Sequence, residues 1–256
     1  MKIRILGAHN CESSDTKLTS LLIDDILALD AGALTSTLSF SAQQKLQAIL
    51  LTHHHYDHIR DIPAIAMNAL LDETTISVYS IASVRNALTD YLLNDELYPD
   101  FFTRPEGSPA VNFTVIKPGE KLRIAGYEVR AVPVNHAVAA VGYQVTASNG
   151  AVVFYTGDTG PGLDDCWQQV SPQLIITEIT APNRYEAFAR DKGHLTPVLL
   201  AQELDHFQRQ KGYLPQVIAV HMNPRQEKEI ASEIARINAP VKASISLAQE
   251  GMLIDL

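Results

Sequence analysis

The stretch LLTHHHYDHIRDIP, residues 50–63, decides how the rest of this chain is interpreted. Four histidines and one aspartate fall within residues 53–58, although the whole sequence contains only nine histidines. Neutral imidazole nitrogens and carboxylate oxygens are the groups with which proteins bind Zn²⁺ and similar ions. The pattern His-x-His-x-Asp-His therefore predicts a metal site in this segment.

The spacing within the segment favours two ion positions. Side chains two residues apart in an extended segment point the same way, so we expect His53 and His55 to hold one ion. Asp57 and His58 follow a turn, and we expect them to face a second ion. His54 points away from the same strand, and we expect it to be exposed or to support a ligand.

Outside this segment, apolar strand-like runs alternate with amphipathic stretches, without an internal repeat or a flexible linker. The alternation predicts two sheets with helices on their outer faces. Helices are expected over 61–71, 81–94, 196–210 and 225–237. Strands or hairpins are expected over 2–7, 20–32, 46–52, 75–80, 111–117, 120–136, 141–158, 173–180, 216–224 and 243–256.

Three further candidate ligands lie where predicted strands end: His136, Asp158 and His221. Strand ends gathered at one edge of a sheet form a cleft lined by rigidly placed side chains. With the four ligands of the 53–58 segment, they provide seven ligands for two ions if one carboxylate is shared.

The His53–His58 segment, His136, TGDTG at 156–160 and HMNP at 221–224 together resemble the metallo-β-lactamase superfamily, in the same order over residues 1–225. The resemblance implies a four-layer αββα sandwich formed by a single domain over residues 1–256. It also implies two divalent ions, with Zn²⁺ preferred and Mn²⁺ or Fe²⁺ as alternatives. One ion is expected on His53, His55 and His136, the second on Asp57, His58 and His221, with Asp158 bridging them.

A binuclear metal-dependent hydrolase is the reaction class that this ligand set indicates. Two ions about 3.5–4 Å apart hold a bridging water, lower its pKa, and so supply a hydroxide nucleophile at neutral pH. We expect Asp158 to orient that hydroxide, and we count Asp57 and Asp158 as catalytic residues as well as ligands. No G-x-S-x-G motif and no Gly-rich phosphate loop offers an alternative site in the sequence.

A further pair, His194 in GHLTP and Glu178 at the end of a predicted strand, resembles the phosphodiesterase branch of the superfamily. That branch includes ribonuclease Z and a class of cyclic-nucleotide phosphodiesterases. The resemblance implies that His194 serves the phosphate or the leaving group and that Glu178 holds its ring. Structural roles, for His194 at the start of a helix and for Glu178 in the fold, are the alternatives.

A small anionic phosphodiester such as a cyclic nucleotide is the favoured substrate. The formal net charge is −9, and residues 95–118 form no basic arm of the kind that clamps transfer RNA. The alternatives are a ribonuclease Z-like RNA 3′-end endonuclease and a lactone or thioester hydrolase, for which His194 would be dispensable. Arg225, which follows HMNP, is expected either to contact substrate or to lie on the surface.

The remaining features concern location and partners. The N-terminus does not read as a signal peptide, and no apolar run approaches the ~20 residues that cross a bilayer. The two cysteines, Cys11 and Cys166, do not suggest a disulfide framework, so a cytoplasmic location and no membrane partner are expected. Dimers are common among proteins that this chain resembles, so a homodimer is a further expectation.

Overall fold

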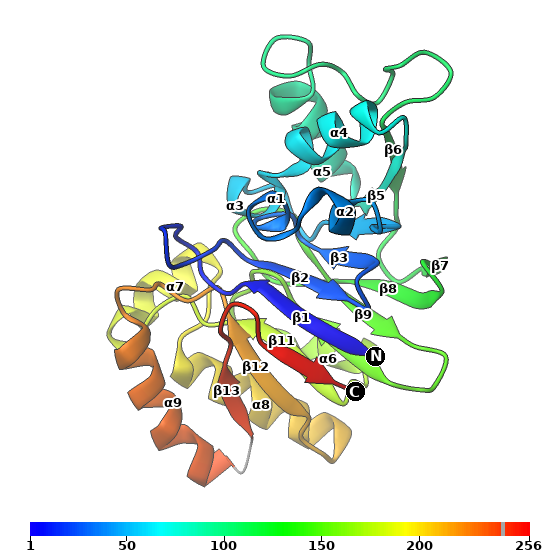
Figure 1. The fold of residues 1–256 in the computed structure, drawn as a ribbon. Coiled ribbons are helices and arrows are strands. Elements are labelled where there is room, and N and C mark those ends of the chain that lie inside the picture. Colours follow the sequence, from blue (N-terminus) through cyan, green and yellow to red (C-terminus); the bar gives the residue numbers. More distant parts are fainter. Residues whose placement is uncertain (242–243) are drawn as a thin grey trace.

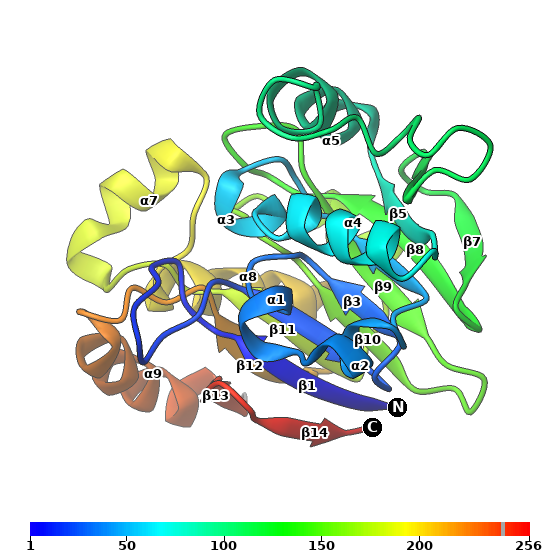
Figure 2. The same ribbon diagram turned by 45° about the horizontal axis from the view of Figure 1, so that its top comes forward.

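The computed structural model describes residues 1–241 and 244–256, and its framework is two seven-stranded sheets packed face to face (Figures 1 and 2). The strands of the first sheet lie in the order β14 (Leu253–Asp255), β1 (Lys2–Gly7), β2 (Ser20–Ile23), β3 (Leu27–Leu29), β4 (Ala48–Leu50), β5 (Ile76–Ser80) and β6 (Val111–Val115). Those of the second lie in the order β13 (Ile245–Leu247), β12 (Gln216–Val220), β11 (Leu174–Glu178), β10 (Val152–Tyr155), β9 (Val141–Thr146), β8 (Tyr127–Pro133) and β7 (Lys121–Ile124).

Strand direction explains where the candidate ligands lie. In the first sheet, β3, β4, β5 and β6 are parallel. In the second, β10, β11, β12 and β13 are parallel, and β8 runs the same way as β10 because both pair antiparallel with β9. The carboxyl ends of parallel strands meet at one sheet edge, which is where ligands bind in sheets of this kind.

Helices cover the outer faces of both sheets (Figure 1). On the first sheet lie α1 (Leu34–Thr37), α2 (Phe40–Gln43), α3 (Tyr56–Ile59), α4 (Ile62–Leu71), α5 (Ala82–Ala87) and the π-helical turn η1 (Leu88–Leu92). On the second lie α6 (Asp164–Gln169), α8 (Pro197–Lys211) and α9 (Glu227–Val241). The 3₁₀ turn η2 (Asn183–Tyr185) and α7 (Glu186–Lys192) project at one end of the sandwich (Figure 2). This is the predicted αββα arrangement. No helix in the described ranges is both long and apolar enough to cross a bilayer.

Alternating side chains of the strands build two cores. Ile3 and Leu21 of the first sheet share one cluster with Tyr143 of the second, so this cluster fills the space between the sheets. Leu22, which follows Leu21, points to the other face and packs with Ile65 of α4 in a separate cluster. The same alternation therefore buries both faces of β2.

Most predicted elements are confirmed, with local differences. The predicted helix over 81–94 ends as α5 at Ala87 and continues as the wide turn η1, in which the Leu93 N–H donates to the Leu88 carbonyl at 2.7 Å. That turn allows Leu88 and Leu93 both to be fully buried. β8 and β10 each end three residues before His136 and Asp158, which lie in the following loops. Residue 243, where the last predicted strand region begins, lies outside the described residues.

Five further helical segments were not predicted. Four of them are α1, α2, α3 and α6, each of four to six residues. The fifth, η2 with α7, is the one that matters for the site, because it forms one wall of the pocket described below.

Candidate metal centre

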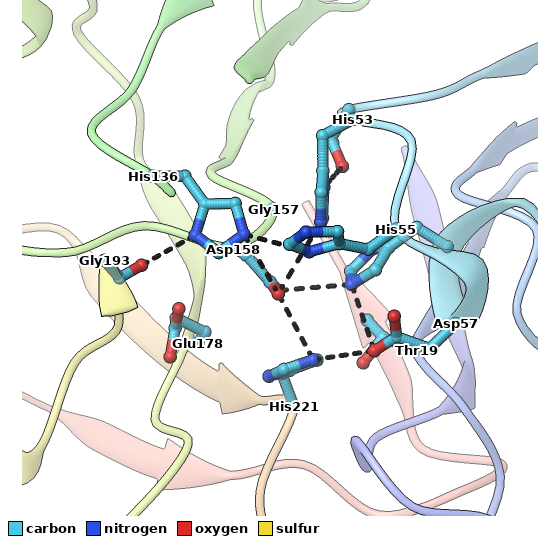
Figure 3. A network of polar contacts seen from close by, with 12 residues as sticks. Thr19, His53, His55, Asp57, His136, Gly157, Asp158, Glu178, Gly193 and His221 are labelled. Carbon is cyan, nitrogen blue, oxygen red and sulfur yellow. Dashed lines mark hydrogen bonds and ion pairs between the residues drawn. The ribbon is translucent and has the colours of Figure 1, made fainter. Parts of the chain in front are cut away.

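Seven side chains from both sheets converge at the edge where the parallel strands end (Figure 3). Their potential ligand atoms form two groups, and within each group all atoms lie within 4.8 Å of one another. The first group contains His53, His55, His136 and Asp158, and the second contains Asp57, His58, Asp158 and His221. These are the two sets that the sequence resemblance implies, with Asp158 common to both.

The loop after β4 supplies the first group with two histidines. His55 has an extended backbone, and its Nδ1 lies 3.2 Å from His136 Nε2. His53 is fully buried, and its Nε2 lies 3.8 Å from Asp158 Oδ2. His54 is half-buried beside His55 and lies outside both groups.

The second group begins in the single turn of α3, where the sequence predicted only a turn. Asp57 Oδ2 lies 3.1 Å from His221 Nε2 and 3.6 Å from His58 Nε2. His221 follows β12 directly and has a left-handed backbone with φ of 61°. That conformation costs free energy in a residue other than glycine, and it is stable only where the surrounding contacts hold the residue in place.

Asp158 lies at the centre of the cluster, as Figure 3 shows. Its Oδ1 is 3.2 Å from His58 Nε2, and its Oδ2 is 3.4 Å from His221 Nε2 and 4.0 Å from His136 Nε2. The preceding Gly157 has φ of 61°, and a Cβ there would lie 2.7 Å from Thr52 Cβ. Only glycine allows the loop to approach Thr52, in the segment after β4, so closely, and this approach brings Asp158 among the histidines.

A buried set of hydrogen bonds supports the cluster from below. Asp30 accepts from the Thr52 N–H at 2.8 Å, the Tyr155 hydroxyl at 2.7 Å and His58 Nδ1 at 2.7 Å, and the Thr52 hydroxyl also donates to it. All four side chains are fully buried. We call Asp30, Thr52, His58 and Tyr155 the Asp30 network. Sequence analysis missed Asp30, and the only signal was an aspartate directly after an apolar strand.

In each ligand histidine except His55, whose Nδ1 itself faces His136, a hydrogen bond on Nδ1 leaves Nε2 free for the centre. His136 Nδ1–H donates to the Gly193 carbonyl at 2.8 Å, so its Nε2 lone pair faces Asp158. Thr180 Oγ1 donates to Glu178 and therefore accepts from His221 Nδ1–H at 2.9 Å. Metal-binding histidines are oriented in this way in proteins generally.

The residues fit a pair of divalent cations. Three buried atoms at the centre, His53 Nε2, His58 Nε2 and Asp158 Oδ1, make no well-aligned hydrogen bond among the described residues, and the last two form only an ion pair at 3.2 Å. Buried polar atoms without partners are costly, and ligand atoms aimed at a cation are a recognised exception. Imidazole with carboxylate is the donor set that Zn²⁺ takes, and Mn²⁺ or Fe²⁺ also accept it.

The histidine pKa values are lowered in the first group and raised in the second. Burial lowers the pKa of His53, His55 and His136, so these rings are neutral, which is the form that binds a metal. Burial also opposes the charge on His58 and His221, but the Asp158 carboxylate overcomes it and raises the pKa of both. The carboxylates of Asp57 and Asp158, whose pKa values, despite burial, the neighbouring histidines lower, therefore favour positive charge beside them, and a divalent cation would supply it.

The predicted pair of His194 and Glu178 lies beside the second group. His194 Nδ1 donates to Glu178 Oε1 at 2.7 Å, and its ring stacks on His221 with centroids 5.7 Å apart. Burial disfavours the charged ring, but the neighbouring Glu178 carboxylate raises the pKa of His194 to about 9. Glu178 also accepts from the Thr159 and Leu195 N–H groups, so both its oxygens are engaged and unsuited to a further ion.

A pocket of about 530 Å³ opens over the cluster and is lined by both the ligands and His194. Its outer wall comes from three segments, of which the sequence analysis had singled out only HMNP at 221–224. We call these residues the rim: Asn10, Cys11, Tyr185, Phe188, Asn223 and Gln226. Arg225 is exposed and does not line the pocket. The aromatic pair three residues apart, at 185 and 188, was the available signal for the rim.

Comparison with known proteins agrees with this geometry. A family model described as the beta-lactamase superfamily domain matches residues 20–232. None of the curated proteins matches the sequence.

Solved structures share the fold at low identity. Unliganded yeast PDE1 superposes with a TM-score of 0.85 at 16% identity, covering 100% of this chain and 99% of that one. The metallo-β-lactamase fold protein YhfI from Bacillus subtilis has a TM-score of 0.77 at 17% identity, covering 99% and 98%. The human short-form tRNase Z has a TM-score of 0.70 at 16% identity, covering 100% and 99%. With the family match over most of its length and this αββα fold, the chain belongs to the metallo-β-lactamase superfamily.

Proposed function

We propose that this protein is a metal-dependent phosphodiesterase that hydrolyses small phosphodiesters, of which cyclic nucleotides are one class. The observation that carries the proposal is the arrangement of two four-ligand groups sharing Asp158, with His194 held against the same pocket. The fold shared with yeast PDE1 and human tRNase Z supports the same choice.

The protein's own residues divide the work. Two divalent ions bound by the seven ligands would supply Lewis acidity and an activated water for hydrolysis. Asp158 sets the spacing of the two groups because it reaches both. His58 cannot rotate away, because Asp30 accepts a hydrogen bond from its Nδ1 and both side chains are fully buried.

His194 is the residue that favours a phosphodiester over a carbonyl substrate. Glu178 fixes its Nδ1, so Nε2 is the nitrogen left for substrate. Its side chain is 17% exposed in the wall of the pocket. From there it donates a hydrogen bond to a phosphate oxygen or a proton to the departing alkoxide.

The pocket suits a small substrate better than transfer RNA. Its volume of about 530 Å³ falls in the range of small-molecule sites. None of the described residues that line it is a lysine or arginine, whereas binding a polyanion needs several such contacts. A net charge of −9 supports the same choice.

Hydrolysis of bis(p-nitrophenyl) phosphate tests the proposal. The protein is loaded separately with zinc and with manganese, and the rate is measured before and after a chelator. We expect chelator-sensitive turnover that falls about tenfold or more in His194→Ala, because the variant loses the hydrogen bond from His194 to a charged phosphate oxygen. His206→Ala is the matched control, since that histidine is half-exposed on α8 and does not line the pocket.

Two results would overturn the proposal. One is no turnover by protein that binds two ions per chain. The other is a His194→Ala variant that hydrolyses the diester as well as the wild type. Turnover of lactones or thioesters by such a variant would identify the protein as a carbonyl hydrolase instead.

We also propose a cytoplasmic location and a homodimer. Cys11 and Cys166 are both free thiols, which supports a reducing compartment. Light scattering of the purified protein tests the dimer directly.

A further inference from the structure

The rim brings together three segments that are far apart in the sequence. The loop after β1 carries Asn10 and Cys11, the η2–α7 segment carries Tyr185 and Phe188, and the segment between β12 and α9 carries Asn223 and Gln226. Both views of the fold show these three segments side by side at one end of the molecule (Figures 1 and 2). The rim is therefore a built surface rather than one loop.

The aromatic part of the rim is exposed, and the η2 turn that carries Tyr185 is anchored to α9. Tyr185 is 39% exposed and Phe188 is 53% exposed, although both line the pocket. The Arg184 guanidinium lies 4.7 Å from the Tyr185 ring centroid and pairs with Glu229 of α9 at 3.0 Å. The Asn183 N–H also donates to a carboxylate of α9, so η2 is tied to that helix. Exposed aromatic rings of this kind offer a surface on which a planar group stacks.

The polar part of the rim consists of amides with unused hydrogen-bonding groups. Asn10 Oδ1 is buried and has no partner among the described residues. Within the same described ranges, the Gln226 side chain makes no hydrogen bond, and the Asn223 amide uses only its oxygen, which accepts from the Arg225 N–H. A buried acceptor without a donor favours a ligand that brings an N–H group.

The distribution of charge along the pocket indicates where each end of a substrate would bind. The ligand cluster and His194 are at the base, where they suit a phosphate. The rim is uncharged, with two aromatic rings and three amides, so it suits a planar, neutral group with donors and acceptors on its edge. Side-chain amides pair with base edges in this way, and aromatic rings stack on base faces.

We infer that the rim is a nucleobase-binding subsite, so that the substrate is a mononucleotide phosphodiester whose base stacks on Tyr185 and Phe188 while the rim amides bind its edge. The inference rests on the proposed function for the phosphate end of the substrate. It adds the residues that determine specificity, and it excludes diesters of simple alcohols as the preferred substrates.

Calorimetric titration of the zinc-loaded protein tests the subsite without turnover. The probes are adenosine 5′-monophosphate and ribose 5-phosphate, which carry the same sugar and phosphate and differ by the base. We expect the nucleotide to bind about tenfold to a hundredfold more tightly, as one base stack commonly contributes. Phe188→Ala and Tyr185→Ala should each weaken nucleotide binding about tenfold and leave ribose 5-phosphate binding within about twofold.

Two more variants complete the design. Asn10→Leu keeps the size of the side chain and removes its amide, and we expect about fivefold or more loss of nucleotide affinity alone. Tyr91→Ala is the control, because this tyrosine is 72% exposed and lies on η1, outside the pocket. Thermal melting of each variant confirms that it is folded.

The outcomes separate the subsite from the proposed function. Equal affinity for the two probes, or rim variants that weaken both probes equally, would overturn the subsite even if the protein hydrolyses bis(p-nitrophenyl) phosphate. A base preference that the rim variants abolish, in a protein without diesterase activity, would leave the subsite standing and remove the proposed function.

Discussion

The Asp30 network and the rim are the two ends of one site, and they are built in opposite ways. In the network, one carboxylate satisfies three buried side chains and a backbone N–H, and none of its members is exposed. In the rim, the aromatic rings are 39% and 53% exposed, and the amides retain unused hydrogen-bonding groups.

The difference separates chemistry from specificity. Ligands that must hold their positions closely need supporting hydrogen bonds beneath them, and a fully satisfied network supplies these. Groups that bind substrate must stay unpaired until the substrate arrives. Changes in the network should therefore affect metal binding and stability, whereas changes in the rim should affect substrate choice.

The largest effect is expected from the carboxylate that joins the two ligand groups. Asp158→Asn keeps the shape but removes the charge that faces four histidines. We expect the variant to bind fewer than two ions per chain and to lose about a thousandfold or more in turnover, equivalent to about 4 kcal/mol of barrier. Elemental analysis and the diester assay measure the two effects.

Asp164→Asn is the control for this prediction, because Asp164 is 58% exposed on α6. Full metal content and activity in Asp158→Asn would contradict the shared-ligand arrangement.

A smaller effect is expected from Asp30, which contacts the candidate ligand His58 and is not itself a ligand. Asp30→Asn leaves the His58 ring without its charged partner, in a place where both are fully buried. Loss of one member of a buried pair costs about 3–5 kcal/mol of stability, and loss of a residue that orients a ligand lowers metal affinity about tenfold to a hundredfold. Urea unfolding and metal titration measure these losses. Unchanged metal affinity in a destabilised variant would show that Asp30 serves the fold alone.

Sequence patterns predicted the candidate metal ligands but not the residues that hold those ligands in place. Residues 53–58 were interpretable because their spacing is fixed by one continuous segment, and His221 because it directly follows an apolar strand. Asp30 and Tyr155 are joined by a hydrogen bond across 125 residues, and no local pattern marks such a pair.

Most of the rim was missed for the same reason. Asn10, Tyr185 and Gln226 have a shared role only once three segments meet, and sheet order determines that meeting. The short helices went unpredicted because four to seven residues are too few to show a helical period. A break in a predicted helix, as at Leu88, likewise depends on what the turn must bury.

A partly buried pair beside the rim tests whether the contacts that support the rim resemble the Asp30 network. His9 precedes the rim residue Asn10, and its Nδ1 donates to Glu250 at 2.6 Å. Burial opposes the charges of both groups, but their hydrogen bond raises the pKa of His9 above 6.5 and lowers that of Glu250 below 4.5. The contribution of charged His9 to the free energy of unfolding is complete below pH 6.5. It is lost as the pH rises through the folded-state pKa of His9.

The contribution of charged Glu250 to the free energy of unfolding is complete above pH 4.5. It is lost as the pH falls through the folded-state pKa of Glu250. Both contributions are therefore present between these values. We expect Glu250→Gln to lower the free energy of unfolding by about 1–2 kcal/mol near pH 6 and by less than half of that near pH 9. Urea unfolding at the two pH values measures the difference. An equal loss at both would mean that the pair acts as a neutral hydrogen bond.

The smallest expected effect is a change in how fast a reagent labels Cys11 at the rim of the wild-type protein. Cys11 is exposed and lines the pocket, whereas Cys166 is buried, and burial beside Glu203 raises the pKa of its thiol to about 12. Because the thiolate is the reactive form, a disulfide reagent should label one thiol per folded chain quickly and the second only on unfolding. Adenosine 5′-monophosphate should slow the fast phase about twofold or more if the base lies on the rim, whereas ribose 5-phosphate should not. Equal protection by both compounds would place the bound group at the ligand cluster and leave the rim open.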